Sequence, residues 1–169
     1  MRFATTILRL LPLVLVLALP RPAVAQGAAA TLELVREDGG TKMLRAADLA
    51  ALPQVEVPSR ARDSTPVTLR GPALRTLLDL AGAPSGHEIR GPRLMLAVVA
   101  EADDGYRVVF SLAELDPSFG ARTAILAMTQ DGGPLPAAEG PYRLVLPDEG
   151  HFSRWVRQVV RLRVVMVAP

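Results

Sequence analysis

Histidine and arginine side chains gather in a short stretch near the C-terminus. His151, Arg154 and Arg157 follow one another at intervals of three residues, so they would share one face if the stretch were helical. Arginine donates planar, bidentate hydrogen bonds that suit phosphate, sulfate or carboxylate, and histidine can add a donor or a proton. The stretch is therefore a candidate anion site. Surface pairing of both arginines with Asp148 and Glu149 is the alternative interpretation.

Elsewhere, the residue types that carry most enzyme chemistry lack the spacing that it needs. His87 and His151 lie far apart in the sequence and do not by spacing indicate a metal site. Asp103 and Asp104 precede Gly105, and turn formation explains all three residues. The chain has no cysteine, no Gly-x-Ser-x-Gly, no Ser-x-x-Lys and no Gly-Lys-Ser/Thr run. We predict no catalytic residue and no metal site.

Trp155, the only tryptophan, lies between Arg154 and Arg157. A position at the edge of the core is the favoured interpretation, and stacking on a ring of a ligand is the alternative. Arg161 and Arg163 alternate with apolar residues, as in a strand with one solvated face. We interpret these two arginines as part of a solvent-exposed strand edge.

Residues 1–25 have the pattern of a secretory signal peptide. Arg2 and Arg9 supply the charged part, an apolar run covers 10–19, and an Ala-Val-Ala sequence ends at Ala25. The apolar run is too short for a bilayer, which takes about 20 residues. Because the two arginines are separated, the signal is not of the twin-arginine type. We predict cleavage after Ala25, a periplasmic or secreted protein, and no membrane span after cleavage.

The predicted mature chain, residues 26–169, has the length of one domain. Loss of Arg2, Arg9 and Arg21 leaves 16 of the 19 basic residues against 17 acidic ones. A domain so close to neutral is not expected to bind nucleic acid. Since no cysteine is present, a hydrophobic core rather than disulfides must stabilise the fold.

Strand patterns outnumber helical patterns after residue 30. Helices are predicted at 46–52 and 72–82, the second with Pro72 in its first turn and Gly82 at its end. The polar residues 59–65 are predicted as a loop. Strands are predicted at 31–36, 41–44, 55–57, 94–100, 106–110, 125–129, 143–146 and 156–167. Because the elements lack regular alternation of strand and helix, we expect an α+β fold with mixed sheets.

Three sequence segments and their order carry a family resemblance. They are Thr68-Leu-Arg-Gly-Pro-Ala-Leu-Arg-Thr-Leu-Leu78 with Ala81-Gly82, the Asp104-Gly-Tyr106 turn, and Gly140-Pro-Tyr-Arg-Leu-Val-Leu-Pro147. Over residues 31–167 the chain resembles the molybdopterin-binding domain of the sulfite-oxidase type. The resemblance implies a compact α+β fold with mixed β-sheets and a few short helices.

In that family a pterin cofactor holds molybdenum and the protein adds one cysteine thiolate. The matching position falls near Ser59 in this chain, and a protonated hydroxyl is a poor replacement for a soft thiolate. The resemblance also implies a pocket with Arg154 and Arg157 on one side, His151 at its edge and Ser59 opposite. No cofactor is expected, and molybdopterin is implied by the resemblance only.

Together these observations predict an exported, non-catalytic binding or accessory module for an anionic small molecule or a periplasmic partner protein. The alternative is a molybdopterin-dependent oxidoreductase whose metal is held by the pterin alone or completed by a partner subunit.

Overall fold

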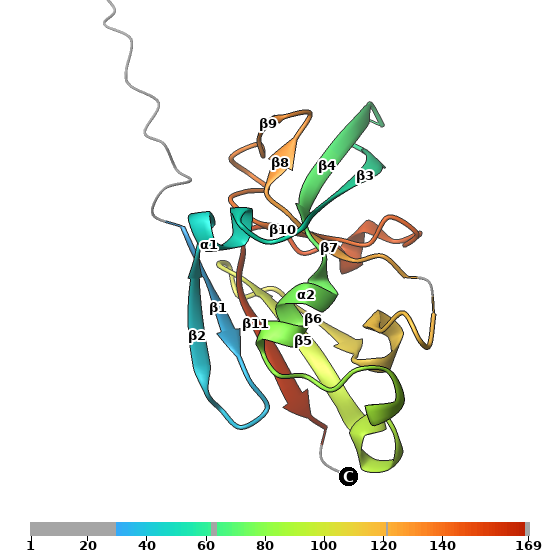
Figure 1. The fold of residues 1–169 in the computed structure, drawn as a ribbon. Helices are drawn as coiled ribbons and strands as arrows, with labels where there is room; N and C mark the ends of the chain where they lie inside the picture. Colours follow the sequence, from blue (N-terminus) through green and yellow to red (C-terminus); the bar gives the residue numbers. More distant parts are fainter. Residues whose placement is uncertain (1–29, 62–63, 121, 168–169) are drawn as a thin grey trace, which may run out of the picture.

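The computed structural model describes residues 30–61, 64–120 and 122–167, so the predicted signal peptide lies outside the described residues. β-Strands form three sheets within this part of the chain (Figure 1). The largest has the order β2-β1-β11-β5-β6 and consists of β1 (Thr31–Val35), β2 (Thr41–Arg45), β5 (Leu96–Ala102), β6 (Arg107–Ser111) and β11 (Val159–Met166).

The other two sheets lie toward the upper end of the view in Figure 1. One has the order β3-β4-β8-β9, with β3 (Gln54–Arg60), β4 (Pro66–Pro72), β8 (Thr129–Gln130) and β9 (Gly133–Pro134). The other pairs β7 (Ile125–Ala127) with β10 (Arg143–Val145). The helices are α1 (Ala46–Ala50), α2 (Leu74–Leu80) and the 3-10 turns η1 (Gly86–Glu88), η2 (Gly91–Met95), η3 (Ala113–Leu115) and η4 (Phe152–Arg154).

The large sheet is mixed because its last strand enters the middle. β11 runs parallel to β1 and antiparallel to β5. The prediction that Arg161 and Arg163 mark an exposed edge is therefore wrong. Arg161 lies between two acidic neighbours in adjacent strands and forms ion pairs with Glu33 and Glu101. Alternation of polar and apolar residues identifies a strand face that meets water, but it does not say whether the strand is central.

Helix α2 begins two residues later than the sequence pattern predicts. Gly71 and Pro72 remain in β4, where Gly71 lies against the backbone of Leu126 so closely that a Cβ would be 1.9 Å from the Leu126 carbonyl oxygen. Only glycine fits such an approach. The helix then buries its leucines, and Gly82, with φ +67°, follows its end as predicted.

Two hydrophobic clusters stabilise the described residues. The larger contains the α2 leucines and the inward residues of the large sheet, including Leu34, Phe110 and Leu162. The smaller lies among β3, β4, β7 and β10 and includes Trp155. No helix in the described part of the chain is long and apolar enough to cross a membrane.

Candidate binding site

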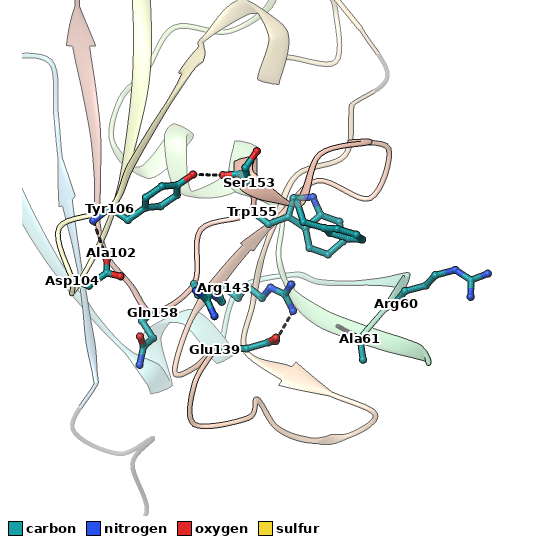
Figure 2. Close-up of a pocket in the computed structure, with 12 residues that line it drawn as sticks. Arg60, Ala61, Ala102, Asp104, Tyr106, Glu139, Arg143, Ser153, Trp155 and Gln158 are labelled. Atoms are coloured by element: carbon teal, nitrogen blue, oxygen red, sulfur yellow. Dashed lines mark hydrogen bonds and ion pairs between the residues drawn. The ribbon is translucent and has the colours of Figure 1, made fainter. Parts of the chain in front are cut away.

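A pocket of about 400 Å³ opens beside the smaller hydrophobic cluster (Figure 2). Its residues come from the end of β3, the β5–β6 turn, the start of β10 and the region before it, and η4 with the segment that follows it to β11. They are Arg60, Ala61, Ala102, Asp104, Tyr106, Glu139, Arg143, Phe152, Ser153, Trp155, Arg157 and Gln158.

Trp155 forms a buried wall of this pocket. Its side chain belongs to the smaller cluster, and the ring of Phe152 meets it edge to face with centroids 4.9 Å apart. The Arg143 guanidinium carbon lies 5.0 Å from the Trp155 ring centroid, within the range of a cation–π contact. The indole Nε1 is buried and has no hydrogen-bond partner. The prediction of a core-edge position for Trp155 is confirmed.

Arg143 brings a positive charge into the wall although β10 is a buried strand. The residue is only 8% exposed and forms a hydrogen-bonded ion pair with Glu139. Burial lowers the pKa of the Arg143 guanidinium; Glu139 opposes that change, and the nearby positive charge of Arg157 adds to it. Arg143 and Arg157 thus bring two like charges into the pocket wall, and Glu139 is paired with Arg143 alone.

Arg157 has no counter-ion within the described residues. It lines the pocket, its side chain is exposed, and no hydrogen bond or ion pair holds it. The backbone positions it firmly, because the next residue, Gln158, adopts φ +49° and its N–H donates to the Glu139 carbonyl at 2.9 Å. Arg157 is thus a free cation on a fixed backbone.

Tyr106 forms the opposite wall (Figure 2). Its hydroxyl donates to the Ser153 carbonyl at 2.5 Å, and its backbone N–H donates to Asp104 Oδ1 at 2.9 Å. Asp104 and Gly105, with φ +85°, form the predicted turn. The ring remains 45% exposed, so these contacts fix an aromatic surface that is still open to a ligand.

The structure separates the three residues that the sequence places on one face. Only the single turn η4 is helical, and His151 and Trp155 on either side of it are extended, so the shared helical face is wrong. Arg157 lines the pocket, whereas Arg154 and His151 do not. The hydrogen bond from the Tyr106 hydroxyl to the Ser153 carbonyl favours the extended backbone of this segment over a longer helix.

Arg154 is held by two carboxylates and does not line the pocket. Its guanidinium donates to Glu149 and to Glu114, both at 2.9 Å, and lies 4.7 Å from the Phe110 ring centroid. The pairing with Glu149, which was the alternative to an anion site, is present for Arg154, and Glu114 is a partner that the sequence does not indicate. Burial raises the pKa of Glu149, but the hydrogen bond from Arg122 and the charges of Arg154 and Arg122 outweigh burial and lower it.

Ser59 lies in β3 opposite Val67 rather than in a loop. Its hydroxyl oxygen is buried, has no hydrogen-bond partner and does not line the pocket. The described residues contain no group of three or more histidine, cysteine, aspartate or glutamate side chains able to hold a metal ion. With a hydroxyl at this position and no cysteine in the chain, the donor set does not fit protein-ligated molybdenum.

Sequence reasoning missed Arg60, Glu139 and Arg143 as site residues. Arg143 lies in the Gly140–Pro147 segment, where the sequence pattern predicts only a strand. An arginine inside an otherwise apolar strand was the available signal, because such a residue needs a partner when buried.

In the described part of the chain, a mixed five-stranded sheet, two smaller sheets and two short α-helices form an α+β fold that is similar to the sulfite-oxidase type, which confirms the predicted fold class. One solved structure with a similar fold is the sulfane dehydrogenase SoxCD from Paracoccus pantotrophus. The match has a TM-score of 0.61 and 19% sequence identity, and it covers 82% of this chain and 39% of that chain. The similarity therefore shows a fold and spans well under half of the matched chain.

No protein-family model matches the sequence, and no curated protein matches it significantly.

Proposed function

We propose that this chain is an exported, non-catalytic binding or accessory module that binds an anionic small molecule in the pocket of Arg143 and Arg157. The observation that carries the proposal is Arg157, which has no ion-pair partner among the described residues, beside the buried, singly paired Arg143. A bound anion would relieve the repulsion between the two guanidinium groups. Hydrogen bonds to charged groups contribute about 1.5–3 kcal/mol each, which suffices for specific binding of a small ion.

His151, Arg154 and Ser59 do not line the pocket and do not contact the ligand in this proposal. Arg154 is paired with Glu114 and Glu149, and His151 lies between Glu149 and Arg154 in the sequence. An anionic group on a partner protein offers the same chemistry as a small molecule, and it is the second form of the same proposal.

A molybdopterin-dependent oxidoreductase is the second candidate, with the metal held by the pterin alone or completed by a partner subunit. The fold similarity to a sulfane dehydrogenase favours it. The missing thiolate and the buried Ser59 hydroxyl weigh against it. Metal analysis of protein purified from its native host separates the candidates: we expect no stoichiometric molybdenum, and one atom per chain would replace the first proposal with the second.

The binding proposal is tested by thermal-shift titration of the purified mature chain with sulfate, phosphate and carboxylates. We expect at least one class of anion to raise the Tm in proportion to the logarithm of its concentration. Arg157→Ala should abolish the response. Arg36→Ala, which removes an exposed arginine from the β1–β2 hairpin, is the matched control and should retain it. Absence of any anion response in the unaltered protein would refute the proposal.

Export is tested separately, by N-terminal sequencing of the protein from its host. The cleavage pattern predicts a chain that begins at Gln26. A retained Met1 would contradict export.

A further inference from the structure

We infer that the ligand is a small aromatic monoanion, such as an aryl carboxylate or sulfonate, whose anionic group binds Arg157 and Arg143 while its ring contacts Tyr106 and Phe152. The inference rests on the proposed anion site and names the ligand class for it. It follows from three features of the pocket: its charge balance, its exposed aromatic surfaces and its size.

The charge balance accommodates one negative charge. Three arginines line the pocket, Arg60, Arg143 and Arg157, against the two carboxylates Glu139 and Asp104, which leaves one positive charge in excess. Glu139 is occupied by Arg143, and the Arg60 side chain donates to the Ser64 carbonyl at 3.1 Å rather than to a carboxylate. Arg60 and Arg157 therefore both lack a carboxylate partner among the described residues, and Arg157, whose side chain makes no hydrogen bond there, is the arginine that is available to a ligand. A second negative charge on the ligand would face repulsion from Glu139 or Asp104.

Two anchored aromatic side chains, those of Tyr106 and Phe152, line the same pocket. Tyr106 and Phe152 are 45% and 59% exposed although both are anchored, the first by its hydroxyl to Ser153 and the second by its edge-to-face contact with Trp155. Anchored rings bind a ligand ring with little loss of side-chain entropy. An inorganic oxyanion would leave both rings in water, whereas an aryl group would cover them. Aromatic pairs typically strengthen binding by about threefold to tenfold beyond burial of area.

The volume sets an upper limit on the ligand. Small-molecule pockets span about 300 to 1,000 Å³, and a pocket of about 400 Å³ lies near the lower end of this range. One or two rings with a single anionic substituent fit that space.

The position of Trp155 supplies a direct assay. It is the only tryptophan in the chain and lines the pocket, so its fluorescence reports occupancy without a label. The mature chain is titrated with benzoate, cyclohexanecarboxylate, acetate and the dianion phthalate at constant ionic strength. We expect benzoate to bind about tenfold more tightly than acetate and at least threefold more tightly than cyclohexanecarboxylate and phthalate.

Two variants locate the contacts. Phe152→Leu should remove the preference for benzoate over cyclohexanecarboxylate while acetate binds as before, and because Phe152 is exposed the Tm should change little. Arg157→Gln should weaken all four carboxylates at least tenfold.

The outcomes separate the ligand class from the underlying anion site. If acetate, sulfate and benzoate bind equally, the aromatic inference is overturned and the anion site stands. Tighter binding of phthalate than of benzoate would overturn the inference that the ligand is a monoanion. If no anion binds, both the ligand class and the proposed function fail. If benzoate binds but Arg157→Gln leaves its affinity unchanged, the binding site lies elsewhere and the inference is overturned.

Discussion

Removal of the Glu139 carboxylate should destabilise the protein because it leaves a buried arginine unpaired. The Arg143 and Glu139 side chains are 9% and 16% exposed, and the pair lies at the wall of a pocket that admits water. Breaking a fully buried pair costs about 3–5 kcal/mol. The water-accessible wall favours the lower end, so Glu139→Gln should reduce the free energy of unfolding by about 3 kcal/mol. For a domain of this size the Tm would fall by about 10 °C.

A double-mutant cycle tests the cause of that loss. The variants are Glu139→Gln, Arg143→Met and the double substitution, each measured by urea unfolding monitored by circular dichroism. With both charges removed, no unpaired charge remains, so the double variant should be more stable than the sum of the single effects predicts by about 2 kcal/mol. Additive effects within about 0.5 kcal/mol would refute the reasoning.

The same substitution should alter anion binding in the opposite direction. Without Glu139, the Arg143 guanidinium is free to bind a ligand, and the pocket holds two excess positive charges. Benzoate should therefore stabilise Glu139→Gln more than it stabilises the unaltered protein. Equal stabilisation would show that Arg143 does not contribute to the site.

Three further substitutions probe other parts of the structure. Burial raises the pKa of Asp116, but hydrogen bonds from Ser118 and Gly86 and the charge of Arg75 outweigh burial and lower this pKa below 3.8. The ionised Asp116 carboxylate therefore stabilises the fold above pH 3.8, and this stabilisation is lost as the pH falls through the lower pKa of the folded state. Asp116→Asn should make the free energy of unfolding less dependent on pH in the acid range of an unfolding titration. Arg154→Ala should lower the Tm because it removes two ion pairs, yet the anion affinity measured by fluorescence titration should stay unchanged. A loss of affinity would show that Arg154 contributes to the binding site. Gly71→Ala should destabilise by more than about 4 kcal/mol in urea unfolding, whereas Gly120→Ala, where a Cβ meets nothing within 4 Å, should change stability little.

The sequence was sufficient for the elements whose signals are local. The β1–β2 hairpin follows from alternation up to Val35 and a turn at Gly39, which has φ +82°. α2 follows from the spacing of its leucines, and the turn at Asp104 and Gly105 follows from residue type. Each feature depends on residues within one or two turns of each other.

The candidate site depended on contacts that local patterns do not contain. Arg154 and Arg157 were grouped by a spacing of three, which brings side chains together only in a helix, and η4 supplies a single turn. The partner of Arg154 that decides its orientation, Glu114, is 40 residues away. Arg60, at the end of β3, reaches the pocket because β3 pairs with β4 over its whole length, and the sequence pattern does not show this pairing. Charge and residue type indicated an anion site near Trp155, and tertiary packing determined which arginine lines it.

The central place of β11 has a consequence for how the chain can fold as it is made. β1 and β5 are separated in the large sheet by a strand that is synthesised after all the other strands in the described residues. Until residues 159–166 emerge, β1 can pair only with β2, and the two halves of the sheet remain unconnected. Pairing over such sequence separations is slow because the intervening chain must first be closed into a loop. The late arrival of β11 would therefore delay completion of the sheet until synthesis of the described strands has ended, which would suit the export that we propose, since an exported chain must still be unfolded when it crosses the membrane.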